Sequence, residues 1–262
     1  MHLEAWQWLV VILCAFGIGL SKGGIAGIGI LPIAIFALVL PASASVGIVL
    51  PLLICGDIVA VSIFRRHAVW GHLQRLFPWA ATGIIGGFLT LYGLQQTHYD
   101  PKLVNHQVGR CIGGILILIV LLHVWRSRAT SHNDVEANQE AVLVPQNSWQ
   151  IWGVGIAAGF ATMVANASGP ILVIYLLAMR LPKMQFIGTA AWFFLILNLF
   201  KVPFMYLLNL INAASLTLDL KLAPCVVAGV LTGRQIIGHI DQKLFENIAL
   251  ALTFVAALRM MF

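Results

Sequence analysis

A lysine set among glycines stands inside an otherwise apolar segment at residues 19–29, which read GLSKGGIAGIG. Lys22 brings a full positive charge, and Ser21 brings a hydroxyl donor. Gly23 and Gly24 let a ligand come close to the backbone. A helix that begins just after this stretch would also point its free N–H groups, and the positive end of its dipole, at the same place. These groups together predict an anion site, whereas a lysine that merely snorkels to the membrane interface is the alternative.

A second short polar stretch interrupts the apolar sequence at residues 165–170, which read ANASGP. Its amide and hydroxyl supply neutral donors, its glycine permits a turn, and its proline suits the first turn of a following helix. We expect the two stretches to meet at one substrate site near the middle of the membrane. The residues predicted to contribute from the second stretch are Asn166, Ala167, Ser168 and Gly169.

Further polar residues stand deep in other apolar segments. Asp57 lies in LPLLICGDIVAVSIF, and Asn198 aligns with it at an offset of 141 residues. Lys201 follows three residues later, on the same helix face as Asn198. A charge at the centre of a membrane helix costs about 2.5–3.5 kcal/mol on the insertion scale, so it requires an ionic partner, a wet cavity or a ligand. Asp57 is predicted to balance a lysine or to carry a coupling proton, with a packing ion pair as the alternative, and Asn198 and Lys201 are predicted to join the substrate site.

The composition places these residues in a membrane. Of the 262 residues 60% are hydrophobic and 9% are charged, and the mean hydropathy is +0.95, whereas a soluble domain carries about 25% charged residues. Apolar runs of about 20 residues span a bilayer as helices, so we predict an all-α polytopic membrane protein. The predicted spans are 42–64, 76–94, 104–125, 184–211, 216–238 and 244–262.

The two segments that carry the polar stretches do not have the length of a single membrane-spanning helix. Residues 6–40 would extend roughly 52 Å as one helix at 1.5 Å per residue, whereas the hydrocarbon core is about 30 Å thick. Residues 150–180 give a similar result. Each segment is therefore predicted to be a pair of shorter helices that meet at a break, which makes about eight hydrophobic segments in all. Whether each pair re-enters on its own side or crosses fully stays open.

The chain divides into two similar parts. A polar linker, 126–148, separates residues 1–125 from residues 149–262. PWAATGIIGG at 78–87 aligns with PCVVAGVLTG at 224–233, which indicates an internal repeat.

Charge in the loops predicts the orientation of these parts. Residues 65–75 carry three arginines and no acid, so this loop and the linker are placed in the cytoplasm. The remaining basic loops are also cytoplasmic if the halves have opposite orientations, each with one broken hairpin and three spans. Inverted repeats with broken helices near the midplane are a common plan of secondary transporters.

No pattern of an enzyme is present. The sequence has no HExxH, GxSxG or paired-carboxylate motif, and no cofactor or metal site is predicted. Its net charge of +6 comes mostly from the ends of spans, where it orients a membrane protein, so nucleic acid is not expected as a partner. Glycine spacings at 83–87, 109–113, 155–159 and 229–233 favour close helix packing and are compatible with a homodimer.

Three stretches carry a family resemblance: GLSKGGIAGIGILP, GFATMVANASGPILVIYLL and GTAAWFFLILNLFKVPFMYLL. Over nearly the whole chain the sequence resembles the sulfite exporter TauE/SafE family of membrane permeases. The resemblance implies an ion-gradient-driven permease of the bacterial inner membrane that moves sulfite or organosulfonates such as sulfoacetate. It also implies that the two breaks form the substrate site. The second break departs from the family's usual GxGGGP, because ANASGP replaces bare backbone with an amide and a hydroxyl.

The function predicted from the sequence is therefore a secondary transporter for a small anion that works by alternating access. Its partners would be the anion and the lipid bilayer. An anion channel with the same lining, and a scaffold or assembly subunit that transports nothing, are the alternatives.

Overall fold

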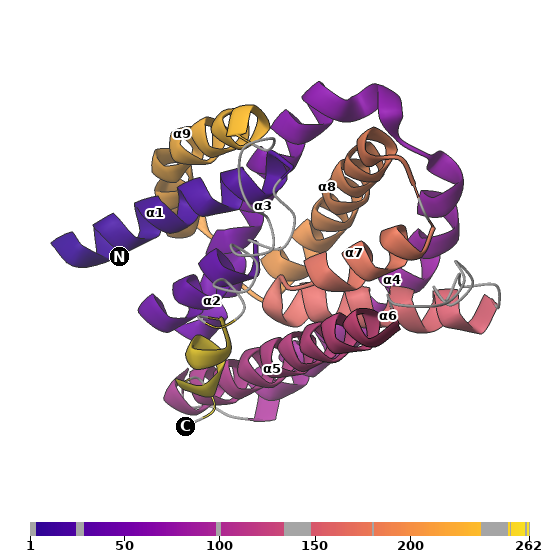
Figure 1. The fold of residues 1–262 in the computed structure, drawn as a ribbon. Coiled ribbons are helices and arrows are strands. Elements are labelled where there is room, and N and C mark those ends of the chain that lie inside the picture. The colour runs from indigo at the N-terminus through magenta and orange to yellow at the C-terminus, as the bar shows by residue number, and fades with distance from the viewer. Residues whose placement is uncertain are drawn as a thin grey trace.

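The computed structural model describes residues 4–24, 29–97, 101–133, 148–179, 181–236, 251, 253–259 and 261. Over these residues the chain forms helices joined by short turns, and it contains no strand (Figure 1). The helices are α1 (Ala5–Lys22), α2 (Ile30–Val39), α3 (Ala42–Phe64), the 3-10 helix η1 (Arg65–His67), α4 (Trp70–Thr97), α5 (Pro101–Asn133), α6 (Ser148–Ala165), α7 (Gly169–Ala178), α8 (Lys183–Leu207) and α9 (Ala213–Ile236). The predicted span 244–262 falls largely outside the described residues.

The fold class is confirmed as all-α and polytopic. Within the described chain, six helices are long and apolar enough to cross a membrane, namely α1, α3, α4, α5, α8 and α9. Two shorter apolar helices, α2 and α6, accompany them. The long segment 6–40 is divided into α1 and α2, and the segment 150–180 into α6 and α7. We call residues 23–29 the first break and residues 166–168 the second break.

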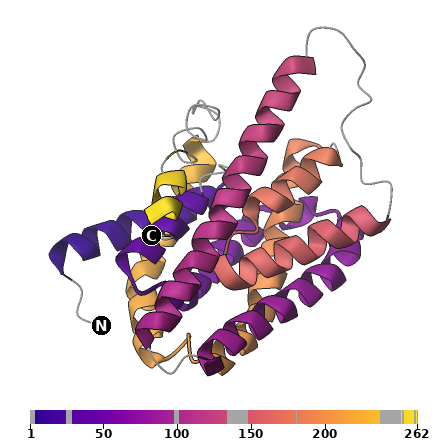
Figure 2. The same ribbon diagram turned by 90° about the horizontal axis from the view of Figure 1, so that it is seen from below.

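The linker begins later than the sequence predicts. The prediction starts it at residue 126, but α5 continues to Asn133, and the end of α5 stands clear of the other helices (Figure 2). Residues 115–133 contain no glycine or proline, so nothing interrupts the hydrogen bonds of the helix where its side chains become polar. Residues 134–147 of the linker lie outside the described residues.

The buried core forms two main clusters. The smaller joins apolar side chains of α1, α2, α3 and α9. The larger is built by α2 to α8, with the residues that follow α8 and two alanines near the C-terminus. Because α2 and α3 contribute to both clusters, they connect the two parts of the bundle.

Glycines let each half of the chain pack closely on the other. The most extensive helix contacts pair α1 with α9 and α4 with α6. A Cβ atom on Gly229 would collide with the α1 backbone at Phe16 and Leu20, and one on Gly83 would collide with the α6 backbone at Ile156 and Phe160. The glycine spacings 83–87, 155–159 and 229–233 are thus confirmed as sites of close helix packing.

These two helix pairs are reciprocal. The first helix of each half lies on the fourth helix of the other half, and the contacts recur in the same register. Gly19 meets the backbone at Val226 and Val230, as Gly159 meets it at Ala80 and Ile84. The halves are therefore interlocked rather than placed side by side.

The third helices of the two halves, α3 and α8, run antiparallel to each other. Gly47, near the start of α3, lies against Leu210 beyond the end of α8. Gly188, near the start of α8, lies 2.9 Å from the carbonyl oxygen of Phe64, measured from an added Cβ. Two repeats of opposite orientation would make such contacts. The division of the chain into inverted repeats stays a prediction.

A pair of glycine variants tests this packing. Replacing Gly83 by alanine places a methyl group against the α6 backbone, and we expect a loss of about 1–3 kcal/mol of stability from overpacking. Gly86, on the same helix, has open space around an added Cβ, so its replacement by alanine should be neutral or stabilising by up to about 1 kcal/mol. Thermal unfolding in detergent measures both; equal effects would contradict the close contact.

Candidate functional site

A cavity of about 120 Å³ lies where the two breaks meet. A water molecule needs only roughly 10–15 Å³ of such space, so the cavity has room for a small anion. The first half contributes Ser21, Lys22, Gly24, Gly29, Ile30, Ile33, Leu53 and Ala60. The second half contributes Thr162, Asn166, Ala167, Ser168, Gly169, Pro170, Val173, Phe186, Ile187, Ala190, Ala191, Phe194 and Asn198.

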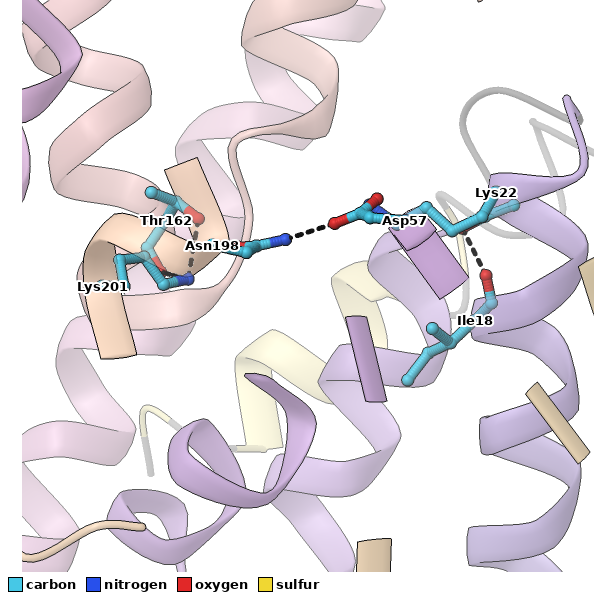
Figure 3. A network of polar contacts seen from close by, with 7 residues as sticks. Ile18, Lys22, Asp57, Thr162, Asn198 and Lys201 are labelled. Atoms are coloured by element: carbon cyan, nitrogen blue, oxygen red, sulfur yellow. Dashed lines mark hydrogen bonds and ion pairs between the residues drawn. The ribbon is translucent and has the colours of Figure 1, made fainter. Parts of the chain in front are cut away.

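Lys22 is held at the wall of the cavity by an acid and an aromatic ring. Its Nζ lies 2.6 Å from Oδ1 of Asp57 and 4.1 Å from the centre of the Phe194 ring, a cation–π distance. Asp57 is fully buried, and its Oδ2 accepts a 2.7 Å hydrogen bond from Nδ2 of Asn198. Figure 3 shows Asp57 between Lys22 and Asn198. Asp57 is therefore the counterion of Lys22 in this structure.

Lys201 lies behind the cavity rather than on its wall. Its Nζ donates to the carbonyl oxygen of Thr162 at 3.0 Å, to Oγ1 of Thr162 at 3.0 Å and to Oδ1 of Asn166 at 2.6 Å. These three bonds use all three hydrogens of the ammonium group, and the side chain is 0% exposed. Figure 3 shows Lys201 and Thr162 together, away from Lys22. In the described part of the chain no carboxylate contacts this ammonium group.

The second break is the end of α6. Asn166 has a φ of 53°, in the left-handed region. Its N–H donates to the carbonyl oxygen of Thr162 at 3.0 Å, which is the single 5→1 bond of the αL helix-ending motif, and the N–H of Ala167 donates to Ala161 at 3.2 Å. Lys201 thus places its charge at the negative end of the α6 dipole.

The side chain of Asn166 joins this helix end to α3. Its Oδ1 accepts from Lys201, and its Nδ2 donates to the carbonyl oxygen of Val46 at 3.0 Å. Both polar atoms are therefore engaged by the protein, and one amide hydrogen has no partner among the described residues. The role predicted for Asn166, a neutral donor to the substrate, is limited to that hydrogen.

Three residues in or next to the first break have different surroundings. Gly24 lines the cavity with a φ of 114°, a value that favours glycine. Ser21 also lines it, but its hydroxyl donates to the carbonyl oxygen of Ile18 at 2.8 Å, so it faces a ligand as an acceptor. Gly23 lies against α9, where an added Cβ would be 2.9 Å from the amide nitrogen of Arg234. Gly23 therefore serves helix packing in this structure rather than the cavity.

The structure brings most of the predicted residues to one place. Those that line the cavity are Ser21, Lys22, Gly24, Asn166, Ala167, Ser168, Gly169 and Asn198. Asp57 and Lys201 lie one hydrogen bond or ion pair behind them. Sequence reasoning missed Thr162 and Phe194. Phe194 precedes Asn198 by four positions on α8, a spacing that puts side chains on one face and could have indicated it. Thr162 lies four positions before Asn166, in the last turn of α6.

A comparison with protein-family models identifies the chain. The model described as Sulfite exporter TauE/SafE matches residues 11–260, nearly the entire sequence. No curated protein and no solved structure matches the chain. The family match agrees with the resemblance of the glycine-rich break, the ANASGP stretch and the α8 sequence. The chain belongs to the sulfite exporter TauE/SafE family of membrane transport proteins.

Proposed function

We propose that the protein is a secondary transporter that carries a small anion, sulfite or an organosulfonate such as sulfoacetate, across the bacterial inner membrane by alternating access. One observation carries the proposal. Lys22, which ends α1 beside the first break, lines the same cavity as residues 166–168 of the second break and Gly169 at the start of α7. A cation, a hydroxyl and the beginning of a helix on one small cavity make an environment suited to an anion.

The charges around the cavity support an anionic substrate. Lys22 pairs directly with Asp57, which also accepts a hydrogen bond from Asn198, and Lys201 bonds separately to Thr162 and Asn166. Two lysines and one aspartate leave one positive charge in excess when all three are ionised. In a setting of low dielectric constant, an uncompensated charge attracts an anion far more strongly than it would in water.

The start of α7 adds backbone donors. Its first helical hydrogen bond in the described chain runs from the N–H of Leu172 to the carbonyl oxygen of Ser168 at 3.0 Å. The N–H groups that precede Leu172 belong to the first turn and have no partner within the helix. Ser168 and Gly169 line the cavity, so the substrate would meet a hydroxyl and the positive end of a short helix there.

The contacts between the halves support alternating access. Carriers built from inverted repeats have broken segments that meet at one substrate site. This chain has two broken segments at one cavity, together with interlocked helix pairs and the antiparallel helices α3 and α8. In such carriers one repeat moves against the other around a fixed site.

A panel of anions tests the substrate class. Purified protein in detergent would be unfolded by heat with sulfite, sulfoacetate, taurine, sulfate, acetate or chloride. A ligand at 100 times its dissociation constant stabilises by roughly 2.7 kcal/mol. We expect sulfite or sulfoacetate to stabilise the protein and chloride not to.

Transport into proteoliposomes is a second test. The proposal predicts that proteoliposomes preloaded with unlabelled anion take up the same anion, labelled, faster than empty ones, because a carrier exchanges anions across the membrane. Uptake that does not saturate would indicate a channel, and the absence of any response would favour a scaffold.

A further inference from the structure

The cavity is asymmetric between the two halves. It extends along the first half of α8, where Ile187 and Ala190 line it. The same offset of 141 residues that aligns Asp57 with Asn198 relates these two positions to Val46 and Val49 of α3. Val46 and Val49 are 3% and 1% exposed. The first half therefore has the equivalent residues on α3, but these residues are buried and do not line a cavity.

Asn166 makes the bond that closes this surface. Its Nδ2 reaches across from the second break to the carbonyl oxygen of Val46. Ile187, the counterpart of Val46, lines the cavity instead, and within the described residues no side chain bonds to its carbonyl oxygen. One face of the assembly is thus bridged by a side chain while its counterpart is open.

The open side is the side of the basic segment η1. Residues Arg65–His67 lie beside the beginning of α8, and the N–H of Val69 donates to Oγ1 of Thr189 at 2.9 Å. This basic segment is expected in the cytoplasm. The cavity therefore lies toward the cytoplasmic half of α8, and the closed surface of α3 lies toward the opposite side of the membrane.

We propose that this structure is the inward-facing state, and that in the outward-facing state the pathway runs along the first half of α3 once Asn166 releases Val46. This inference rests on the proposed carrier mechanism. It assigns the outer pathway and the hydrogen bond that holds it closed, from Asn166 to Val46, which we call the latch. Because α3 and α8 are equivalent elements in antiparallel contact, an exchange of conformations between the halves closes the surface at Ile187 and Ala190 as it opens the one at Val46 and Val49. Asn166 acts as a positioning residue in this exchange.

Cysteine labelling from the two sides of the membrane tests the proposal without any substrate. The four native cysteines would be replaced by serine, and Val49→Cys and Ala190→Cys would be introduced one at a time. A maleimide that cannot cross membranes is applied to right-side-out and inside-out vesicles. We expect Ala190→Cys to react from the cytoplasmic side, and Val49→Cys to react only from the periplasmic side. Reaction of both cysteines from the same side would overturn the proposal.

The latch itself is tested with Asn166→Gly. Glycine keeps the left-handed backbone of this position but removes the amide. One net hydrogen bond corresponds to roughly a 3- to 10-fold change in an equilibrium. We therefore expect the periplasmic labelling rate of Val49→Cys, divided by the cytoplasmic rate of Ala190→Cys, to rise about 3- to 10-fold, with the second rate falling.

Asn209→Gly is the matched control. Asn209 also has a positive φ, of 57°, and follows the last turn of α8, so its replacement removes a comparable helix-ending side chain. It should leave the ratio unchanged. If Asn166→Gly raised both rates together, the bond would merely hold the fold and the latch would be disproved. Reciprocal labelling without any response to anions would instead overturn the substrate class alone.

Discussion

Replacing Lys22 by methionine is expected to abolish anion transport and to weaken anion binding at least about 100-fold. Methionine keeps the apolar stem but removes the charged donor that lines the cavity. Truncating one partner of a hydrogen-bonded charge pair in a desolvated site costs about 2–5 kcal/mol. A 100-fold loss of affinity corresponds to about 2.7 kcal/mol and lies within this range. Uptake of labelled anion into proteoliposomes and thermal stabilisation by the same anion measure the two losses separately.

The same substitution is expected to destabilise the protein, because it leaves Asp57 without its ionic partner. Asp57 is 0% exposed, and an uncompensated buried charge costs about 3–5 kcal/mol. Adding Asp57→Asn removes that charge and preserves a polar partner for Asn198. The double variant should therefore regain most of the stability and none of the transport. If Asp57→Asn restored transport as well, Lys22 would be a structural counterion and the anion site would lie elsewhere.

Replacing Lys201 by methionine is expected to weaken anion binding about 30-fold although Lys201 does not line the cavity. Its ammonium group bonds to Thr162 and Asn166, which do line it. At a separation of about 7 Å and an effective dielectric constant of about 20, one charge contributes roughly 2 kcal/mol to binding of an anion. The substitution removes the positive charge that is in excess around the cavity. Titration of the anion into the purified variant measures the change.

Lys221→Met is the control for this prediction. It removes a charge of the same sign from α9, where the ammonium group lies 5.7 Å from the centre of the Trp8 ring, and it should leave anion affinity unchanged. Lys201→Met also leaves Oδ1 of Asn166 without its donor, so a loss of about 1–3 kcal/mol of stability is expected beside the change in affinity. Unchanged affinity in Lys201→Met would show that the excess charge does not act on the substrate.

The broken segments could be predicted from their length and local composition. A run of 35 residues from 6 to 40 does not fit a bilayer as one helix, and the glycines with Lys22 mark where it divides. The Asn-Ala-Ser-Gly stretch marks the second break in the same way. Both positions follow from local composition and helix geometry, which a sequence carries directly.

The partners of the buried polar residues could not be predicted in the same way. Helical spacing places Asn198 and Lys201 on one face, but they bond in different directions, to Asp57 and to the end of α6. Which helix faces each side chain depends on how α3, α6 and α8 cross. The spacing of residues within one helix does not contain that information.

The end of α6 illustrates the same limit. Asparagine tolerates the left-handed region and is a recognised helix-ending residue, so a turn at Asn166 was accessible from sequence. Its two side-chain bonds were not, because Lys201 and Val46 are 35 and 120 residues away. The sequence therefore indicates the residue that ends the helix, while the tertiary fold decides that its amide is occupied.

The reciprocal packing of α1 on α9 and of α6 on α4 bears on how the protein is made. The glycine-lined face of α1 is complete at residue 22, whereas α9 begins only at residue 213, and α4 likewise precedes α6. Until the second half arrives, these faces can meet only lipid or the membrane-insertion machinery. Biogenesis therefore cannot finish one half and then the other, because α9 of the second half completes the contacts of α1.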